Sequence, residues 1–278
     1  MPGAKEFRKA RGAAVKARTR LLTDTRKEIV RQLGEARDQV AKILAGQPTD
    51  YQRWSLPRLQ AEIDQALGTF SQEAGAQISG AAGRAWELGQ DLVDKPLEAA
   101  GFQVRSAMQA IDTRQLQAMR SFMTGRIKDI AVKAANGINS QLGLVVIGAQ
   151  SPSGAIGAVT KILGEQSRKR ATTIVRTELN RAFHVAAHER LKDAATKVPG
   201  MQKQWRKSGK RHPRLSHAAI DGQVQDVGRP FVLKGGSVKI MFPGDPRAPA
   251  GETINCGCTV LPHKSDWKVQ HAGRLPDE

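Results

Sequence analysis

The chain between residues 205 and 263 contains, in order, Trp205-Arg206-Lys207, Arg214-Leu215-Ser216-His217, Ile220-Asp221-Gly222, Phe242-Pro243-Gly244-Asp245-Pro246 and Asn255-Cys256-Gly257-Cys258. Both cysteines and three of the six histidines of the chain lie in this segment. Short runs of β-branched and aromatic residues, separated by glycine and proline, indicate small antiparallel strands. The expected strands are 202–206, 223–227, 231–233, 239–242 and 259–261, with one helical turn that Ser216 caps and Gly222 ends.

The two cysteines are better placed to share a ligand than to form a disulfide. In an extended segment Cys256 and Cys258 point to the same side, and residues two apart lie near the upper distance limit for a disulfide. A structural zinc ion is one interpretation, with His217 and either His212 or His263 completing a tetrahedral set of ligands.

Two other interpretations use the same segment. In the first, His217, Asp221 and Arg214 perform acid–base chemistry on a phosphodiester. In the second, the cluster is purely architectural: Asp221 ties a turn, Asn255 closes a bend, and the cysteines are small buried residues. The residue types alone leave the three interpretations open.

The order and spacing of these pieces resemble the C-terminal domain of the phage Mu F-like minor head proteins, a phage head-morphogenesis family. The resemblance covers about 142–263. The family usually has a basic residue between the two cysteines, where this chain has Gly257. The residues that carry the resemblance are Arg176, Thr177, Glu178, Trp205, Arg214, Ser216, His217, Asp221, Gly222, Pro243, Gly244, Asp245, Pro246, Asn255, Cys256 and Cys258.

This resemblance implies a virion protein present in several copies per particle, on the inner side of the head near the portal vertex. The expected partners are the portal protein and the major capsid protein, and the positive charge of the chain adds packaged double-stranded DNA. Before assembly such a protein resides in the host cytoplasm. The family implies a role in assembly and not a proven enzymatic activity.

Positive charge is concentrated in two blocks. The net charge is +18; residues 1–31 carry 10 Lys and Arg against 3 acidic residues, and residues 165–215 carry 14 against 4. Blocks this uneven favour contact with DNA or an acidic protein surface over a merely solvated helix face. The expected polyanion-binding residues are Arg168, Lys169, Arg170, Arg181, Lys203, Arg206, Lys207, Lys210 and Arg211.

His184 and His188 are four residues apart in the second basic block. The glutamate that follows them, Glu189, is in the wrong position for the zincin motif, which places it between the histidines. We therefore expect both histidines on an outer helix face with Arg181 and Lys192, in contact with solvent or DNA. Arg176 and Glu178 point away from each other, and each is expected to anchor this helix to the C-terminal domain.

Helical periodicity dominates the first half of the chain. Apolar residues recur at helical spacing, and Asp94-Lys95-Pro96 is expected to break the second helix. Glycines between 137 and 164 predict either a hinge or a tight packing site. The expected helices are 5–46, 55–94, 104–138, 156–163 and 165–195. No apolar run is long enough to span a membrane, and no signal peptide is visible.

The expected fold is α+β and mostly α, with a long N-terminal helical hairpin or bundle followed by a small α+β domain that has a short antiparallel sheet. The expected divisions are a basic N-terminal arm (1–48), a long helical hairpin (49–141), a Gly-rich hinge (142–164), a Mu F-like head-morphogenesis domain (165–263) and a polar tail (264–278).

We expect a minor capsid protein of a tailed phage, which binds portal, capsid and packaged DNA during assembly or genome delivery. One alternative is a virion-associated nuclease or other DNA-modifying enzyme. Another is a general DNA-binding protein unrelated to virions. DNA cleavage that is abolished in His217→Ala would favour the enzyme.

Overall fold

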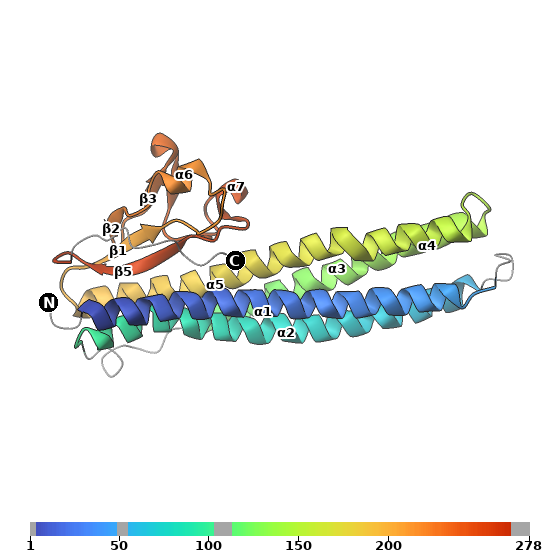
Figure 1. Cartoon of the computed structure of the whole chain (residues 1–278), viewed down its shortest axis with the longest axis horizontal. Coiled ribbons are helices and arrows are strands. Elements are labelled where there is room, and N and C mark those ends of the chain that lie inside the picture. The colour runs from blue at the N-terminus through green and yellow to red at the C-terminus, as the bar shows by residue number, and fades with distance from the viewer. Residues whose placement is uncertain (1–3, 49–54, 103–112, 268–278) are drawn as a thin grey trace. The chain divides into compact units, whose positions relative to one another are not determined.

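The structure of the protein is a computed structural model that describes residues 4–48, 55–102 and 113–267. Long helices precede a region of short antiparallel strands (Figure 1), which confirms the expected mostly-α, α+β fold. The long helices are α1 (Ala4–Ala45), α2 (Leu56–Ala99), α3 (Arg114–Val146) and α5 (Ser167–Lys197). Between α3 and α5 lie the short helix α4 (Pro152–Lys161) and a π-helical turn, Ile162–Gln166.

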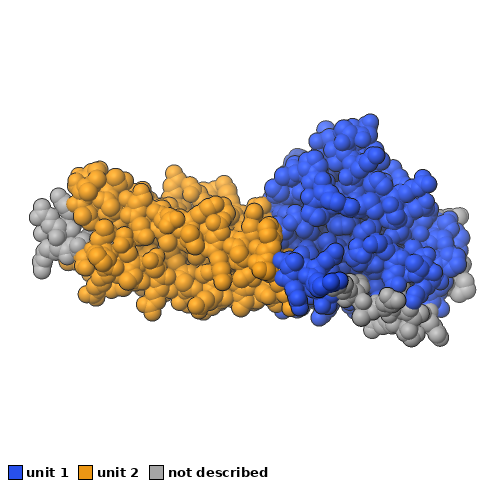
Figure 2. Space-filling view, turned by 180° about the vertical axis from the view of Figure 1, so that it is seen from behind, with its two compact units in different colours: residues 1–24, 81–119, 175–278 blue, residues 25–80, 120–174 orange. Residues whose placement is uncertain are grey.

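The residues form two compact units (Figure 2). Unit 1 comprises residues 1–24, 81–119 and 175–278, and unit 2 comprises residues 25–80 and 120–174. The boundaries of the units fall within α1, α2, α3 and α5. The linear division into arm, hairpin, hinge, domain and tail stays a prediction.

Unit 2 is helical throughout most of its described residues. Its core is aliphatic and aromatic, and it includes Ile29, Leu33, Val40, Leu59, Ile63, Leu67, Phe70, Ile78, Met123, Ile127, Ile130, Ile138 and Leu142. These positions recur mostly every three or four residues on α1, α2 and α3, so each helix buries one continuous face. At Gly137, an added Cβ would lie 3.2 Å from Cδ1 of Ile162. A hinge and a tight packing site were the two alternatives for the glycines between 137 and 164, and at Gly137 the structure shows tight packing.

The break expected at Asp94-Lys95-Pro96 is wrong, because α2 continues through Pro96 to Ala99. Asp94 is buried, and its carboxylate accepts two hydrogen bonds from Arg190 of α5, at 2.7 and 2.9 Å. This buried bidentate pair fixes the last turns of α2 against α5 within unit 1. The first part of the third expected helix (104–112) and the tail from residue 268 lie outside the described residues.

Glycine permits a close approach of helices α2 and α5 in unit 1. A Cβ added to Gly89 would lie 2.2 Å from the backbone carbonyl oxygen of Phe183 and 2.9 Å from Cβ of Ala186. No side chain fits there without movement of the backbone. Phe183 and Ala186 are themselves fully buried.

The strands of unit 1 form two small antiparallel sheets. The first has the order β2 (Val224–Asp226), β1 (Met201–Arg206), β5 (Thr259–Lys264), with Trp205 opposite Val260 and Gln204 opposite Val224. The second pairs β3 (Phe231–Leu233) with β4 (Val238–Ile240). Trp205 is completely buried, and its ring contacts that of Phe231 at 5.3 Å between centroids. This aromatic contact joins the two sheets in one core.

Candidate metal centre

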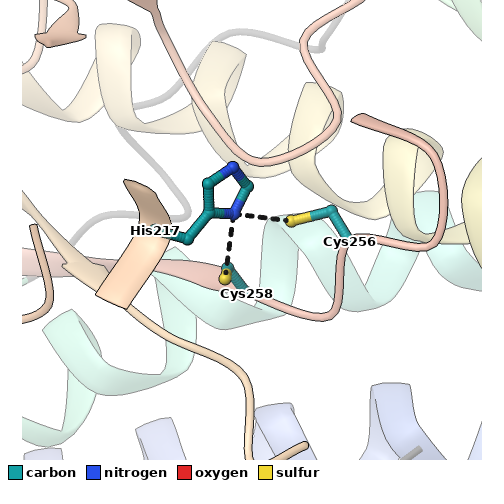
Figure 3. Close-up of side chains that lie close together, drawn as sticks. All are labelled: His217, Cys256 and Cys258. Atoms are coloured by element: carbon teal, nitrogen blue, oxygen red, sulfur yellow. Dashed lines mark hydrogen bonds between the residues drawn. The ribbon is translucent and has the colours of Figure 1, made fainter. Parts of the chain in front are cut away.

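Three side chains of the C-terminal region converge in the interior of unit 1. His217 lies on the one-turn helix α6 (Leu215–Ala218), and the two cysteines lie between the one-turn helix α7 (Ala250–Thr253) and β5. The Nδ1 atom of His217 is 3.5 Å from Sγ of Cys256 and 3.4 Å from Sγ of Cys258 (Figure 3). All three residues are buried, and their donor atoms lie within 4.8 Å of one another.

The loop that carries the cysteines is held by its backbone. Asn255 adopts φ 54°, a left-handed conformation that asparagine tolerates, and its N–H donates to the hydroxyl of Thr177. Five successive carbonyl groups accept side-chain hydrogen bonds: Ile254 from Arg214, Asn255 from Lys210, Cys256 from Asn180, and Gly257 and Cys258 from Arg18. Donors from α1, α5 and the 210–214 segment thus fix the direction in which both thiols point.

Glu252 lies behind the imidazole of His217. Its Oε2 atom is 3.0 Å from Nε2 of His217, although the N–H bond is not aligned with that oxygen, which accepts from Ser216 instead. Its other oxygen pairs with Lys234 at 2.6 Å. Burial opposes ionisation of Glu252, but the hydrogen bonds from Lys234 and Ser216 outweigh it, so its pKa lies below the usual value. An ionised carboxylate at Nε2 favours the tautomer in which Nδ1 presents its lone pair to the sulfur atoms.

The two thiols differ in their pKa values. The hydrogen bond from Cys258 lowers the pKa of Cys256 well below its ordinary value, and His217 adds to this effect. The same hydrogen bond, together with burial, raises the pKa of Cys258. One thiol of the pair therefore ionises readily and lies next to a histidine, an arrangement suited to a metal site with thiolate ligands.

A cavity of about 310 Å³ opens beside the cluster. All three donor residues line it, together with Lys210, His212 and Arg214. His217 also contacts the Trp205 ring edge-on, at 5.2 Å between centroids. The donors therefore have an apolar neighbour in the core and a basic cavity beside them.

The geometry of the cluster agrees with zinc coordination. With Zn–S near 2.3 Å and Zn–N near 2.05 Å, a tetrahedral ion places its nitrogen and sulfur ligands about 3.6 Å apart. The two observed distances from Nδ1 of His217 are 3.5 and 3.4 Å. The donor set, two thiolates and an imidazole, is also the type that zinc prefers.

The structure brings together three of the four expected metal ligands. His263 is not among them: it lies on β5, opposite Gln202 of β1, and its ring faces Trp267 at 6.3 Å between centroids. The burial of His263 and the nearby charge of Arg11 lower the pKa of its imidazole.

Asp221, expected beside His217 on one helical turn, lies beyond the end of α6. It accepts a hydrogen bond from the backbone N–H of Lys207, and its carboxylate is 3.3 Å from Arg206. The N-cap residue of α6 is Arg214, so the expected cap at Ser216 is wrong. Gly222 follows this turn and donates its N–H to the carbonyl of Trp205.

The expected outer face of the second basic helix is wrong for its histidines. His184 and His188 are 1% and 7% exposed. His184 lies 3.0 Å from the carbonyl oxygen of Cys258, and His188 packs against Phe242. Charged residues flank both histidines in the sequence. Within unit 1, the aliphatic stems of these charged residues pack against neighbouring segments, and their polar groups form hydrogen bonds there.

Several of the expected polyanion-binding side chains are also buried or engaged inside unit 1. Lys203 is fully buried and donates to the carbonyl of Met241, and Arg206 is 5% exposed. Arg181 donates to the carbonyl of Gly244 and pairs with Glu178 of its own helix. These three side chains present little charge at the surface.

The remaining expected residues keep more of their charge accessible. Lys207 and Arg211 are exposed, and Lys210 is half-buried. In unit 2, Arg168 is exposed, Lys169 pairs with Glu165, and Arg170 pairs with Asp129. Arg176 is half-buried on α5.

Asp245 has a structural role in the loop that begins at Phe242. It is 1% exposed, and its carboxylate accepts hydrogen bonds from the backbone N–H groups of Met241 and Arg247 and from the Arg247 guanidinium. Burial raises the pKa of Asp245, but these hydrogen bonds lower it by more, so the carboxylate is ionised at neutral pH. It closes the loop against α5, where Arg181 binds the carbonyl of Gly244.

Sequence reasoning missed three residues that shape the site: Arg18, Asn180 and Glu252. Arg18 is fully buried, although it lies in the strongly basic first block of the chain. Glu252 is the one acidic residue between Arg247 and Asp266, and its place three residues before the Asn255 turn was an available signal. Arg18 and Asn180 act from 240 and 76 residues away in the chain, and no local pattern indicates that.

The fold and the site together define a largely helical, basic protein whose distinctive chemistry is a buried Cys–His cluster in a small α+β region. The chain matches the family described as "Phage Mu protein F like protein" over residues 106–261. It belongs to this family, and the resemblance inferred from residues 142–263 is confirmed. This family suggests a protein of phage head morphogenesis.

One curated relative has a similar segment. Over 104 residues the chain is 37% identical to "Uncharacterized protein YqbB" of Bacillus subtilis (strain 168), a stretch that covers 37% of this chain and 33% of that protein. The chain thus spans about a third of the length of this relative. No solved structure matches. Among the described residues, no helix is both long enough and apolar enough to cross a membrane.

Proposed function

We propose that the protein is a minor capsid protein, which acts inside the phage head near the portal vertex and is present in several copies per particle. It binds portal or major capsid protein and contacts packaged double-stranded DNA during assembly or genome delivery. The observation that carries this proposal is the family match over more than half of the chain.

The surface charge of unit 1 supports the contact with DNA. The part of α1 within this unit exposes Lys5, Arg8, Lys9, Lys16 and Arg20. Burial, together with the like charges of Arg206 and Arg8, lowers the pKa of Arg11 to about 10. Like charges around Arg11 give this region a positive potential, and a phosphate backbone would relieve their repulsion.

A DNA-binding titration tests this contact. The double variant Lys207→Glu/Arg211→Glu replaces two exposed cations, and we expect its affinity to fall and its log–log salt slope to become shallower by roughly 0.9 for each phosphate that it no longer neutralises. The matched control is Lys239→Glu, an exposed lysine of the near-neutral segment 216–278, which should bind like the wild type. An equal fall in the control would contradict a localised DNA-binding surface. The DNA should stay intact, and cleavage abolished by His217→Ala would favour the nuclease instead.

Composition of assembled heads tests the location. Cross-linking of purified particles should recover the protein together with portal subunits, in a small number of copies relative to the major capsid protein. Particles that lack the protein, or cross-links confined to the major capsid lattice away from the portal, would contradict the proposed position.

A further inference from the structure

The Cys–His cluster has three converging donors and a cavity where a fourth would stand. We propose that His217, Cys256 and Cys258 bind a zinc(II) ion with one coordination position open to the adjacent cavity, where water or an oxyanion such as phosphate occupies it. This site concerns the chemistry of the C-terminal region and does not depend on where in the particle the protein acts.

The number of protein ligands follows from the residues near the cluster. Among the described residues, the only candidate donor group here comprises His217, Cys256 and Cys258. Glu252 faces the far nitrogen of His217 and so supports the ligand without reaching the ion. Structural zinc sites are closed by four protein ligands, whereas sites with three keep a position for an exogenous ligand.

The loop geometry suits a preformed site. The hydrogen bonds to the carbonyl groups of residues 254–258 already aim both thiols at Nδ1 of His217. Zinc binding displaces the thiol protons to solvent, and both sulfurs become thiolate ligands.

The charge around the open position favours an anion. Two thiolates neutralise a zinc ion, and the charge of Glu252 is balanced by Lys234. Lys210 and Arg214 then remain on the cavity wall. Each donates one hydrogen bond to a loop carbonyl, at 2.6 Å, and keeps further N–H groups for a ligand. An oxyanion bound to the ion would therefore also receive charge-assisted hydrogen bonds.

The first measurement uses the full-length wild type. Zinc content by mass spectrometry should approach one ion per chain, and removal of the ion by a chelator should expose two reactive thiols. Cobalt(II) in place of zinc should give thiolate charge-transfer absorption and the intense visible bands of four-coordinate cobalt. A wild type that takes up neither ion, or that contains a disulfide between Cys256 and Cys258, overturns the proposal.

Single substitutions identify the ligands. Cys256→Ser, Cys258→Ser and His217→Ala should each lower metal affinity at least tenfold, with circular dichroism to verify that the helices remain. His263→Gln is the matched control, because His263 is a buried histidine of the same unit outside the cluster, and it should retain a full ion. Glu252→Gln should weaken binding by less than loss of a ligand does, because it removes the carboxylate charge 3.0 Å from Nε2 of His217 but no hydrogen bond to it. If a cysteine variant does not fold, the thiolate bands of the cobalt-loaded wild type still report ligation by Cys256 and Cys258, the two cysteines of the chain, and an unchanged spectrum of His263→Gln excludes His263.

Addition of phosphate tests the open position. We expect inorganic phosphate, at constant ionic strength, to shift the visible cobalt bands, and Lys210→Met/Arg214→Met to require at least a tenfold higher phosphate concentration for the same shift. His212→Ala should leave the cobalt spectrum unchanged. If phosphate has no effect, or if His212→Ala changes the coordination number, the position is closed and the proposal of an open site is overturned.

Discussion

The two units bury different kinds of side chain. Among the described residues of unit 2, the buried polar side chains are Thr25, Gln32 and Ser167, and none of them carries a charge. Unit 1 buries Arg18, Asp94, Glu178, Arg190, Lys203, Arg206, Asp245 and Glu252, as well as four histidines. Unit 2 is therefore specified by apolar periodicity, whereas unit 1 depends on polar groups that must each find a partner.

This difference predicts where single substitutions are most damaging. An unpaired buried charge costs several kcal/mol, whereas the apolar contacts of a helical bundle tolerate changes that preserve volume. The most sensitive positions should thus be the buried ion pairs of unit 1, and the least sensitive should be the ion pairs on the surface of unit 2.

The largest effect is expected at the Asp94–Arg190 pair. Arg190→Met leaves the buried Asp94 carboxylate without its two hydrogen bonds from the guanidinium, and we expect the free energy of unfolding to fall by about 3–5 kcal/mol in urea denaturation. The double variant Asp94→Leu/Arg190→Met removes both charges and should recover most of this stability. If the double variant were as unstable as the single one, the pair would be acting through shape and not through charge.

A smaller destabilisation is expected where α2 meets α5. Gly89→Ala places a methyl group 2.2 Å from the carbonyl oxygen of Phe183, and the required shift of backbone should cost roughly 1–3 kcal/mol. Gly68→Ala on the same helix meets nothing within 4 Å, and should stabilise the protein by about 0.4–1 kcal/mol. Equal thermal midpoints for the two variants would show that the helices separate easily at Gly89.

The buried histidines of unit 1 predict an acid-sensitive fold. Burial and the charges of Lys203, Lys192 and Arg247 lower the pKa of His188 to about 3, against an opposing effect of Asp245. A folded-state pKa below the unfolded value of about 6.5 gives stability that is present above pH 6.5 and is lost as the pH falls toward 3. Each such histidine contributes a slope of about 1.4 kcal/mol per pH unit within that window.

Substitution of His188 isolates this contribution. In His188→Gln the slope of unfolding free energy between pH 6.5 and 4.5 should be shallower by about one proton, because glutamine does not take up the proton that the unfolded-state imidazole binds in this range. His212→Gln, which changes an exposed histidine, should leave the slope unaltered. A wild-type slope retained in His188→Gln would mean that other groups, such as His184, carry the acid sensitivity.

The same contrast explains which features the sequence could predict. Apolar periodicity placed α1 within one residue at each end, at Ala4–Ala45 against 5–46, and short β-branched runs placed all five strands within a few residues. These are local signals. The choice of His217 over His263 as partner of the cysteines depends on how α6 and β5 are placed by Trp205 and the sheet register, and no spacing in the sequence encodes that.

The high positive charge of one segment led to a wrong prediction of surface exposure, because composition is also a local signal. The segment 165–215 is strongly basic, and a solvated or DNA-facing surface is the usual consequence of such composition. Within unit 1, however, Lys203 finds a carbonyl acceptor and the face of the Phe231 ring, at 5.2 Å from its centroid. The pKa of Lys203 falls to about 8, mainly through burial. Partners this distant in sequence turn a surface residue type into a core residue.

The smallest effect is expected for the exposed ion pairs of unit 2, where Arg31 on α1 pairs with Glu28 and Glu35. Arg31→Gln removes two ion pairs and should leave the urea midpoint unchanged within error, because exposed pairs are screened by water and salt. Even at low salt concentration, the destabilisation by Arg31→Gln should stay well below that by Arg190→Met. If Arg31→Gln destabilised the protein as strongly as Arg190→Met, burial would not explain the different sensitivity of the two units to loss of an ion pair. A network of charges along α1 would then contribute to stability.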